Sequence, residues 1–245
     1  MERKQLLVRA LTIWRERGGD RDVALTLIEL SSVNWAIGLH KEGIQQAKEA
    51  SEILERLGDT GSQAQCLINL THLLRSDNQL DAAEEAALHA VNLLPEKGDE
   101  FRVCGSHRAL GNIYRFKGDT EKAIRHFKVA IGIASSFNWH DTLFCLHCEL
   151  AVLLRKEGRF DDAHIHTEHA KSHTAGNAYY LGCAMELQAR VWYDQHRLEE
   201  AKSEVLRAAD VYEKIGATER VEGCKGLLRD IEKGLNTPVA SGQSD

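Results

Sequence analysis

Three histidines in the stretch HIHTEHAKSH have the spacing of a helical metal site. His166, His169 and His173 stand at positions i, i+3 and i+7, so one stripe of a helix carries all three imidazole rings. Imidazole nitrogen is a good ligand for zinc, nickel and copper ions. Small residues form the packing face of the same helix, which places the three histidines toward solvent. The pattern supplies no carboxylate or thiol beside them that would complete the ligand set of a metal ion. We therefore expect a solvated face, with metal binding as the weaker alternative.

Two cysteines have the spacing of a thiol redox motif. Cys145 and Cys148 form a C-x-x-C string, but the string lies within an expected helix and lacks the strand–helix context of a redox site. Cysteines also recur about once every 40 residues, at Cys66, Cys104, Cys145, Cys183 and Cys224. This recurrence indicates small apolar packing positions with free thiols in a reducing compartment, and a thiol sensor is the alternative.

Three arginines recur at one interval along the chain. Arg75, Arg115 and Arg155 are 40 residues apart, and each follows a leucine by five positions. The chain carries 37 acidic and 31 basic residues, a net charge of −6, so a periodic row of cations is not expected from composition. Guanidinium groups bind carboxylates through paired hydrogen bonds, which makes the row a candidate site for an acidic ligand. The alternative is that arginine, a good helix former, here only faces solvent.

The elements that position these residues recur with the same period. One column of small residues reads Ala50, Ala90, Ala130, Ala170 and Ala208. Seven positions earlier a second column reads Gly43, Ala83, Ala123, Ala163 and Ala201, and twelve positions before that a third reads Ser31, Thr71, Gly111, Ala151 and Ala189. Small residues on the buried face of a helix indicate that another helix approaches closely, and a fixed period indicates a repeat architecture.

These columns resemble the signature of the tetratricopeptide-repeat family over about residues 1–234. The third repeat carries the signature most fully, with Leu110, Gly111, Tyr114, Gly118, Ala123, Phe127 and Ala130, and Pro95 keeps the closing proline of the second. The resemblance implies an all-α fold, a right-handed α-solenoid of tandem helix pairs of about 40 residues. The long period is similar to that of kinesin light chains. The amino-acid sequence of the repeats looks most like that of the C-terminal arrays of fungal STAND-type (NB-ARC/NACHT) NTPases, in which a nucleotide-binding module lies upstream.

The period divides the chain into an incomplete repeat, five full repeats, a cap and a tail. Residues 1–20 are expected to form an unpaired second-type helix, and residues 217–234 a C-terminal capping helix. The helix over 2–17 bears apolar residues such as Leu7 and Trp14, which predicts a missing partner, in a chain cut from a longer array or through self-association of this helix. The alternative is that this helix caps the first repeat. The full repeats span 21–59, 60–99, 100–139, 140–176 and 177–216, and the polar tail 235–245 is expected to be disordered.

The resemblance also implies where a ligand binds. In tetratricopeptide arrays the first helices line a concave groove, and the periodic arginines point into it. Neighbouring groove positions hold Arg108, Asn112, His72, Lys156 and Arg190, and the flanks end in Trp35 and Tyr193. A protein segment or acidic peptide is therefore the expected partner. A chaperone-tail clamp is not expected, because Glu149 stands where that clamp requires an asparagine.

Composition excludes several functions. The sequence has 43% hydrophobic and 28% charged residues with two prolines, as an all-α globular chain has. No 18-residue apolar run predicts a membrane span, and the acidic balance argues against nucleic-acid binding, so we expect a cytoplasmic protein. The patterns GxxxxGK[ST], GxGxxG and HExxH are missing, so we expect neither an enzyme nor a cofactor.

The sequence therefore predicts a non-enzymatic scaffold that binds a peptide or protein segment, as part of a larger STAND signalling protein. A self-association module is the first alternative, and a metal or thiol sensor is the second.

Overall fold

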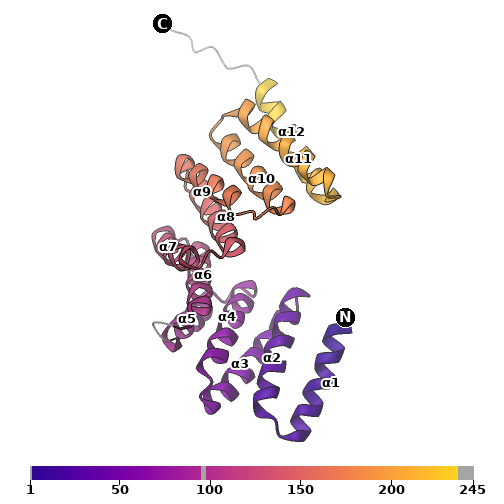
Figure 1. The fold of residues 1–245 in the computed structure, drawn as a ribbon, viewed down its shortest axis with the longest axis vertical. Coiled ribbons are helices and arrows are strands. Elements are labelled where there is room, and N and C mark those ends of the chain that lie inside the picture. The colour runs from indigo at the N-terminus through magenta and orange to yellow at the C-terminus, as the bar shows by residue number, and fades with distance from the viewer. Residues whose placement is uncertain (1, 95–97, 237–245) are drawn as a thin grey trace. The chain divides into compact units, whose positions relative to one another are not determined.

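The structure is a computed structural model that describes residues 2–94 and 98–236. These residues form twelve α-helices and no β-strand, which confirms the predicted all-α fold class (Figure 1). The helices are α1 (Glu2–Arg17), α2 (Asp20–Ala36), α3 (His40–Leu57), α4 (Thr60–Ser76), α5 (Leu80–Leu93), α6 (Glu100–Lys117), α7 (Thr120–Ser136), α8 (His140–Lys156), α9 (Phe160–Ser172), α10 (Ala178–Asp194), α11 (Leu198–Lys214) and α12 (Thr218–Asn236). The predicted disordered tail largely falls on residues 237–245, which lie outside the described residues.

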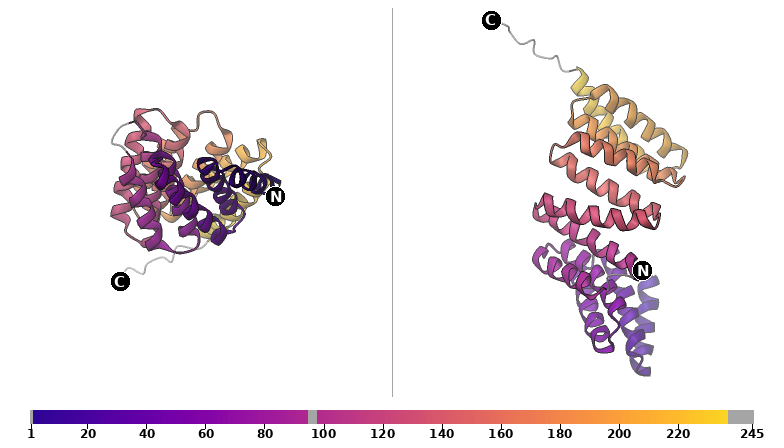
Figure 2. Two further views of the ribbon diagram at one scale, coloured as in Figure 1. Left: turned by 90° about the horizontal axis from the view of Figure 1, so that it is seen from below. Right: turned by 60° about the vertical axis from the view of Figure 1, so that its left-hand side comes forward.

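The chain divides into two compact units, one over residues 1–133 and one over 134–245. In the N-terminal unit α2 packs against α3, α4 against α5, and the first helices α2, α4 and α6 contact one another in turn. In the C-terminal unit α8 packs against α9 and α10 against α11, and α8, α10 and α12 contact one another in the same way. Figure 2 shows the two helices of each hairpin running antiparallel. Each unit is thus a stack of helical hairpins, as a helical-repeat protein requires.

The predicted columns of small residues are the seams between helices. The alanines of the first two columns are fully buried, and so is Ser31 of the third column. Gly111 shows why the residues must be small, because a Cβ atom added there would lie 2.8 Å from ring atoms of Phe127, which is itself fully buried. Gly43 is similar, since its Cβ atom would lie 2.7 Å from a methyl carbon of Leu73. Backbone therefore packs directly against side chain at these seams.

The turns between helices also repeat. Each hairpin turn and each turn between hairpins contains a residue with a positive φ angle: Gly18, Gly38, Gly58, Asn78, Gly98, Gly118, Asn138, Gly158, Gly176, His196 and Gly216. At Gly58 the left-handed residue follows α3, and the next amide, that of Asp59, donates to the carbonyl of Leu54, as in a Schellman cap. Asp59 then accepts from the amide of Ser62 and caps α4.

Helix α1 is fixed on the N-terminal unit by both apolar and charged contacts. Leu7, Leu11 and Trp14 pack against the core of this unit, so Leu7 and Trp14 are covered within the chain, and a missing partner for the helix as a whole stays a prediction. Lys4 and Arg15 also reach α3, with ion pairs of 2.8 Å to Glu42 and 2.6 Å to Glu49. The apolar residues left exposed on α1 are instead Leu6, Val8 and Ile13.

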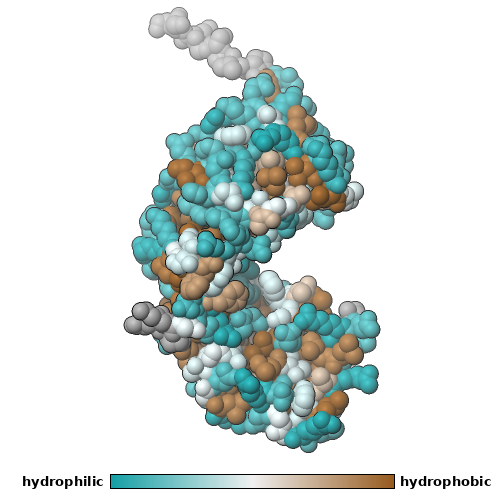
Figure 3. All heavy atoms as spheres, viewed as in Figure 1, coloured by the Kyte–Doolittle hydropathy of each residue, from teal (hydrophilic) through white to brown (hydrophobic). Residues whose placement is uncertain are grey.

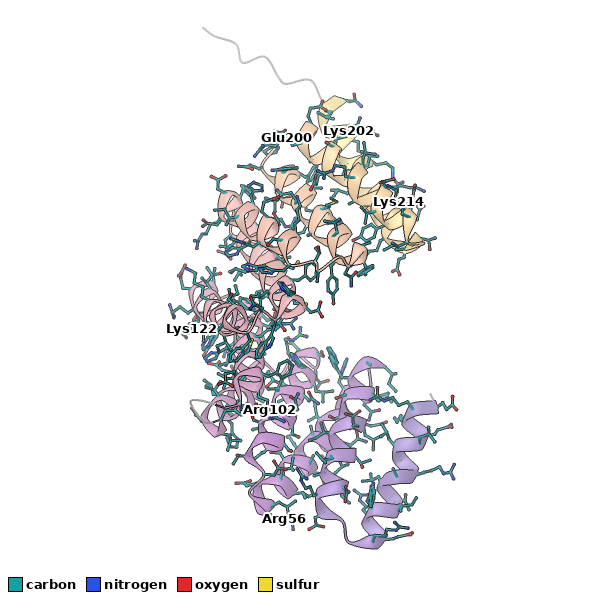
Figure 4. The ribbon with its side chains drawn as sticks, in the orientation of Figure 1. Arg56, Arg102, Lys122, Glu200, Lys202 and Lys214 are labelled. Atoms are coloured by element: carbon teal, nitrogen blue, oxygen red, sulfur yellow. The ribbon has the colours of Figure 1, made fainter. Side chains whose placement is uncertain are left out.

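Helix α12 occupies the place of a first helix beyond the fifth pair. It contacts both α10 and α11, and its residues Val221, Cys224, Leu227 and Ile231 are buried. Figure 4 marks Lys202 on α11, which forms a 3.1 Å ion pair with Glu232 of α12. Over the visible face of each unit, hydrophobic residues are scattered among hydrophilic ones (Figure 3).

Candidate functional site

Two of the three periodic arginines meet on one aromatic ring. Arg75 on α4 and Arg115 on α6 each place the guanidinium carbon 4.9 Å from the ring centre of Phe116. The Phe116 side chain is about half exposed, so the ring carries two cations at the surface. Sequence reasoning missed Phe116, although it directly follows Arg115. These three residues form a cationic, partly apolar surface that we call the arginine–phenylalanine patch.

Asn112 positions this patch rather than facing a ligand. Its side chain is buried, and its Oδ1 accepts a 2.9 Å hydrogen bond from Nη2 of Arg115. Its Nδ2 donates to the backbone carbonyl of Arg108 at 3.3 Å. The predicted pair of Arg108 and Asn112 is therefore in contact through the helix backbone, and the amide of Asn112 holds the guanidinium of Arg115.

The predicted aromatic flank of the N-terminal unit is built from two repeats. The ring of Trp35 on α2 stacks on that of His72 on α4, with centroids 5.7 Å apart. The indole Nε1 donates to the hydroxyl of Ser76 at 3.1 Å. Trp35 remains exposed over 43% of its surface.

The remaining predicted residues lie in the C-terminal unit. Arg155 forms a 2.9 Å ion pair with Asp194, and Lys156 is exposed at the end of α8. Tyr193 packs against the core of this unit and does not stand out as a surface anchor. Arg155 belongs to a different unit from Arg75 and Arg115, so the regular spacing of all three arginines stays a prediction.

A second charged cluster in the C-terminal unit was not predicted, apart from Arg190. The buried carboxylate of Glu186 accepts from Arg190 at 2.9 Å and from Arg220 at 3.4 Å. The hydroxyl of Tyr212 donates to the same carboxylate at 3.3 Å, and Nε of Arg220 donates to the hydroxyl of Tyr179 at 3.1 Å. That last bond raises the pKa of Arg220, so its charge is permanent. The sequence signal for this cluster is the i, i+4 pair of Glu186 and Arg190.

The three candidate metal ligands lie against the neighbouring helix, with His169 exposed and His166 and His173 half-buried. The buried ring of His147 on α8 stacks on His166, His169 and His173, with centroids 5.2, 4.9 and 5.7 Å apart. The Nδ1 atoms of His147 and His166 are 2.9 Å apart, and those of His173 and His140 are 3.2 Å apart. The expected solvated stripe is therefore only partly present, because α8 contributes two further imidazoles, those of His147 and His140, opposite these residues. We call these five residues the histidine cluster.

A sequence signal for the histidine cluster was available. His107 and His126 precede His147 and His166 by 40 residues, and their Nδ1 atoms are 3.0 Å apart in the same arrangement. Over residues 2–94 and 98–236, no group of three or more histidine, cysteine or acidic side chains has an arrangement that could hold a metal ion. The histidine pairs therefore join the two helices of a hairpin.

The cysteines have the properties of packing residues. None of the six cysteines, which all lie in the described part of the chain, forms a disulfide bond. Burial raises the pKa of Cys148 to about 12, and it raises the pKa of Cys66 to about 12 as well. A thiol with such a pKa stays protonated at neutral pH and is a poor nucleophile.

These observations define the class of protein: an array of helical hairpins whose first helices carry surface arginine clusters. The tetratricopeptide-repeat family model matches residues 106–137, which are most of the third repeat. A search of the curated proteins finds no match. The prediction of a tetratricopeptide-repeat protein is confirmed by this match together with the solved structures of the same fold.

Three of those structures are informative. A STAND protein with a tetratricopeptide-repeat sensor from Pyrococcus horikoshii is 16% identical, with a TM-score of 0.73 over 89% of this chain and 34% of that chain. A Rap protein complexed with competence and sporulation factor is 15% identical, with a TM-score of 0.64 over 95% of this chain and 72% of that one. YrrB, a tetratricopeptide-repeat protein with an unusual peptide-binding site, is 15% identical, with a TM-score of 0.52 over 82% of this chain and 92% of that one. At these identities the likeness concerns the fold.

No helix in the described part of the chain has the length and apolar character needed to span a bilayer.

Proposed function

We propose that this protein is a non-enzymatic scaffold that binds an acidic peptide or protein segment on its first helices. The observation that carries the proposal is the arginine–phenylalanine patch, in which two neighbouring first helices hold Arg75 and Arg115 over the exposed ring of Phe116. A carboxylate can bind either guanidinium, while an apolar neighbour in the peptide covers the ring. Trp35 offers a second aromatic contact on α2, and YrrB supports the proposal as a peptide-binding protein of this fold.

The test is a comparison of peptide binding between matched variants. Immobilised peptides that differ only in their number of aspartate and glutamate residues are probed with the native protein and with an Arg75→Gln, Arg115→Gln double variant. We expect the native protein to prefer acidic peptides and the double variant to bind them at least tenfold more weakly. Binding should also weaken as salt shortens the Debye length below about 8 Å.

The control is Arg56→Gln, which removes one positive charge from the exposed end of α3 (Figure 4). We expect this variant to bind as the native protein does. Equal binding of acidic peptides by the native protein and the double variant, with native circular dichroism in both, would refute the proposal.

A second candidate function is self-association through residues 2–17. It is favoured by the exposed side chains of Leu6, Val8 and Ile13 and by a surface cavity of about 570 Å³ that Val8 shares with Ile37 and Leu39. Burying apolar area of this kind against a second copy is favourable by about 25 cal/mol per Å². Light scattering over a dilution series should show a dimer that Val8→Glu abolishes, and a monomer at every concentration would reject the idea.

We also propose that the array is the sensor of a larger STAND-type signalling protein, as the resemblance to fungal STAND arrays implies. The support is the Pyrococcus horikoshii structure, of which this chain covers about a third. Sequencing the genomic region upstream tests this: we expect a nucleotide-binding module encoded in the same reading frame, and an unrelated upstream gene would reject it.

A further inference from the structure

A cavity of about 280 Å³ in the C-terminal unit gathers more positive than negative charge. It lies among α8, α10 and α12 and is lined by three arginines, Arg155, Arg190 and Arg220, and by one carboxylate, that of Glu186. The counter-ion of Arg155, Asp194, lies outside the lining. Among the lining residues three guanidinium groups face one carboxylate, so the lining itself carries a residual positive charge. An adjoining cavity of about 690 Å³ shares Glu186, Arg190 and Arg220.

The arginines are held in place before any ligand arrives. Glu186 is only 10% exposed in its side chain and binds the guanidinium groups of both Arg190 and Arg220. Because these arginine side chains are already ordered, they lose little conformational entropy when a ligand binds. The Nε atom of Arg155 is buried without a hydrogen-bond partner among the described residues, which leaves one donor of this cluster unsatisfied.

The rest of the cavity wall is apolar. Phe144 and Leu187 line it, and the ring of Phe144 is fixed by stacking on Tyr180, with centroids 4.3 Å apart and planes within 9°. Small-molecule sites occupy about 300–1,000 Å³, so this cavity holds a group about the size of one amino-acid residue. A bare anion would leave the apolar wall uncovered, and an uncharged apolar group would leave the guanidinium donors unpaired.

We propose that this cavity binds a carboxylate attached to a compact apolar body. The C-terminal residue of a partner peptide and a small free carboxylic acid are two sources of this chemistry. The peptide source rests on the proposed function, whereas the small acid does not. In both cases the carboxylate lies against Arg155 and Arg190 and the apolar body against Phe144.

The probe for the experiment is N-acetyl-leucine, titrated into the full chain at millimolar concentration and followed by amide chemical shifts. N-acetyl-leucinamide has the same body without the charge, and acetate and inorganic phosphate have charge without the body. We expect saturable shifts in α8, α10 and α12 with N-acetyl-leucine, and at least tenfold weaker binding of the three controls. Equal binding of the amide, or equal or tighter binding of phosphate, would overturn the proposal.

Variants tie the shifts to the cavity. Arg155→Gln and Arg190→Gln should each weaken N-acetyl-leucine binding about tenfold. Arg229→Gln, which removes an exposed arginine from α12, should leave it unchanged. Arg155 lies outside the Glu186 network, so its variant keeps the test decisive if Arg190→Gln fails to fold. Unchanged affinity in a folded Arg155→Gln protein would overturn the proposal.

Two further arms separate this proposal from the proposed function. The Arg75→Gln, Arg115→Gln double variant should bind N-acetyl-leucine normally, since both substitutions lie in the other unit. A pentapeptide with a free C-terminal leucine identifies the source: tighter binding than N-acetyl-leucine indicates a peptide, and equal binding indicates a small acid. Loss of N-acetyl-leucine binding in the double variant would contradict the assignment of this site.

Discussion

At the scale of single residues, helix packing requires glycine at positions where a neighbouring side chain leaves no room for a Cβ atom. Gly111 and Phe127 are the clearest case, because the fully buried ring occupies the space that a Cβ atom of residue 111 would take. The same relation recurs in the last hairpin, where a Cβ atom at Gly182 would lie 2.7 Å from the ring of Tyr212. Glycine within a helix lowers its intrinsic stability, so its presence here reflects packing.

Gly111→Ala should therefore destabilise the N-terminal unit although alanine favours the helix. We expect a loss of about 1–3 kcal/mol in the free energy of unfolding, because the buried ring of Phe127 cannot move aside. Urea denaturation measures this. Gly132→Ala is the matched control, since nothing lies within 4 Å of a Cβ atom there, and it should be neutral or stabilising by about 0.5–1 kcal/mol. Equal effects of the two substitutions would show that packing does not select Gly111.

The columns of small residues were predictable at this scale because the same close contact between helices recurs in each repeat and requires a small residue at the same position. The arginine–phenylalanine patch was not, because Arg75 reaches the ring of Phe116 only through the way in which α4 packs against α6. Sequence period placed Arg75 and Arg115 in equivalent positions, but Phe116 occurs in only one repeat. A contact that does not repeat leaves no periodic signal.

At the scale of one element, the α8–α9 hairpin is sensitive to acid. Burial, followed by the neighbouring charges of His166, His169 and His173, lowers the pKa of His147 from 6.5 to about 3. The unfolded chain binds this proton at higher pH than the folded chain does. The stability linked to neutral His147 is therefore fully present above about pH 6.5 and is lost as the pH falls toward 3.

Lowering the pH from 8 to 5 should consequently reduce the melting temperature of the C-terminal unit. The protection factors of the α8 and α9 amides, which correct for the slower intrinsic exchange at lower pH, should fall as well. The variant His147→Phe keeps a ring in the stack and removes the titrating group, so its melting temperature should fall less over the same range. Parallel curves for the two proteins would mean that His147 does not control the acid response.

The stripe of His166, His169 and His173 was visible in the sequence, but its partner was not. Whether an i, i+3, i+7 stripe meets solvent or another helix depends on how α8 is rotated against α9. Sequence alone favoured solvent because no ligand set was complete. The structure instead supplies His147 and His140 from α8.

At the scale of the whole molecule, contacts within each unit join only neighbouring repeats. Within the C-terminal unit, α12 contacts α10 and α11. In such an array stability is a sum of local terms, and damage spreads only to adjacent repeats.

Ile231→Ala should show this. Ile231 on α12 is fully buried, so truncation should cost about 2–5 kcal/mol. Hydrogen exchange should accelerate in α10–α12 and remain native in α2–α5. Leu206→Ala removes the same kind of side chain from an exposed position of α11 and should change stability by less than about 0.5 kcal/mol. Uniform acceleration over both units would contradict a nearest-neighbour array.

The left-handed residues at the turns have a genetic consequence. Such a residue ends a helix about every 20 positions. A DNA segment that spans the distance between two equivalent turns therefore encodes a complete hairpin together with the residues that end its helices. Unequal crossing-over between two such segments would lengthen or shorten the array by one whole hairpin and leave every other helix in phase. A deletion of a few codons inside a helix would instead rotate every downstream face away from its neighbour. The array can therefore evolve in length by whole hairpins far more easily than by single residues.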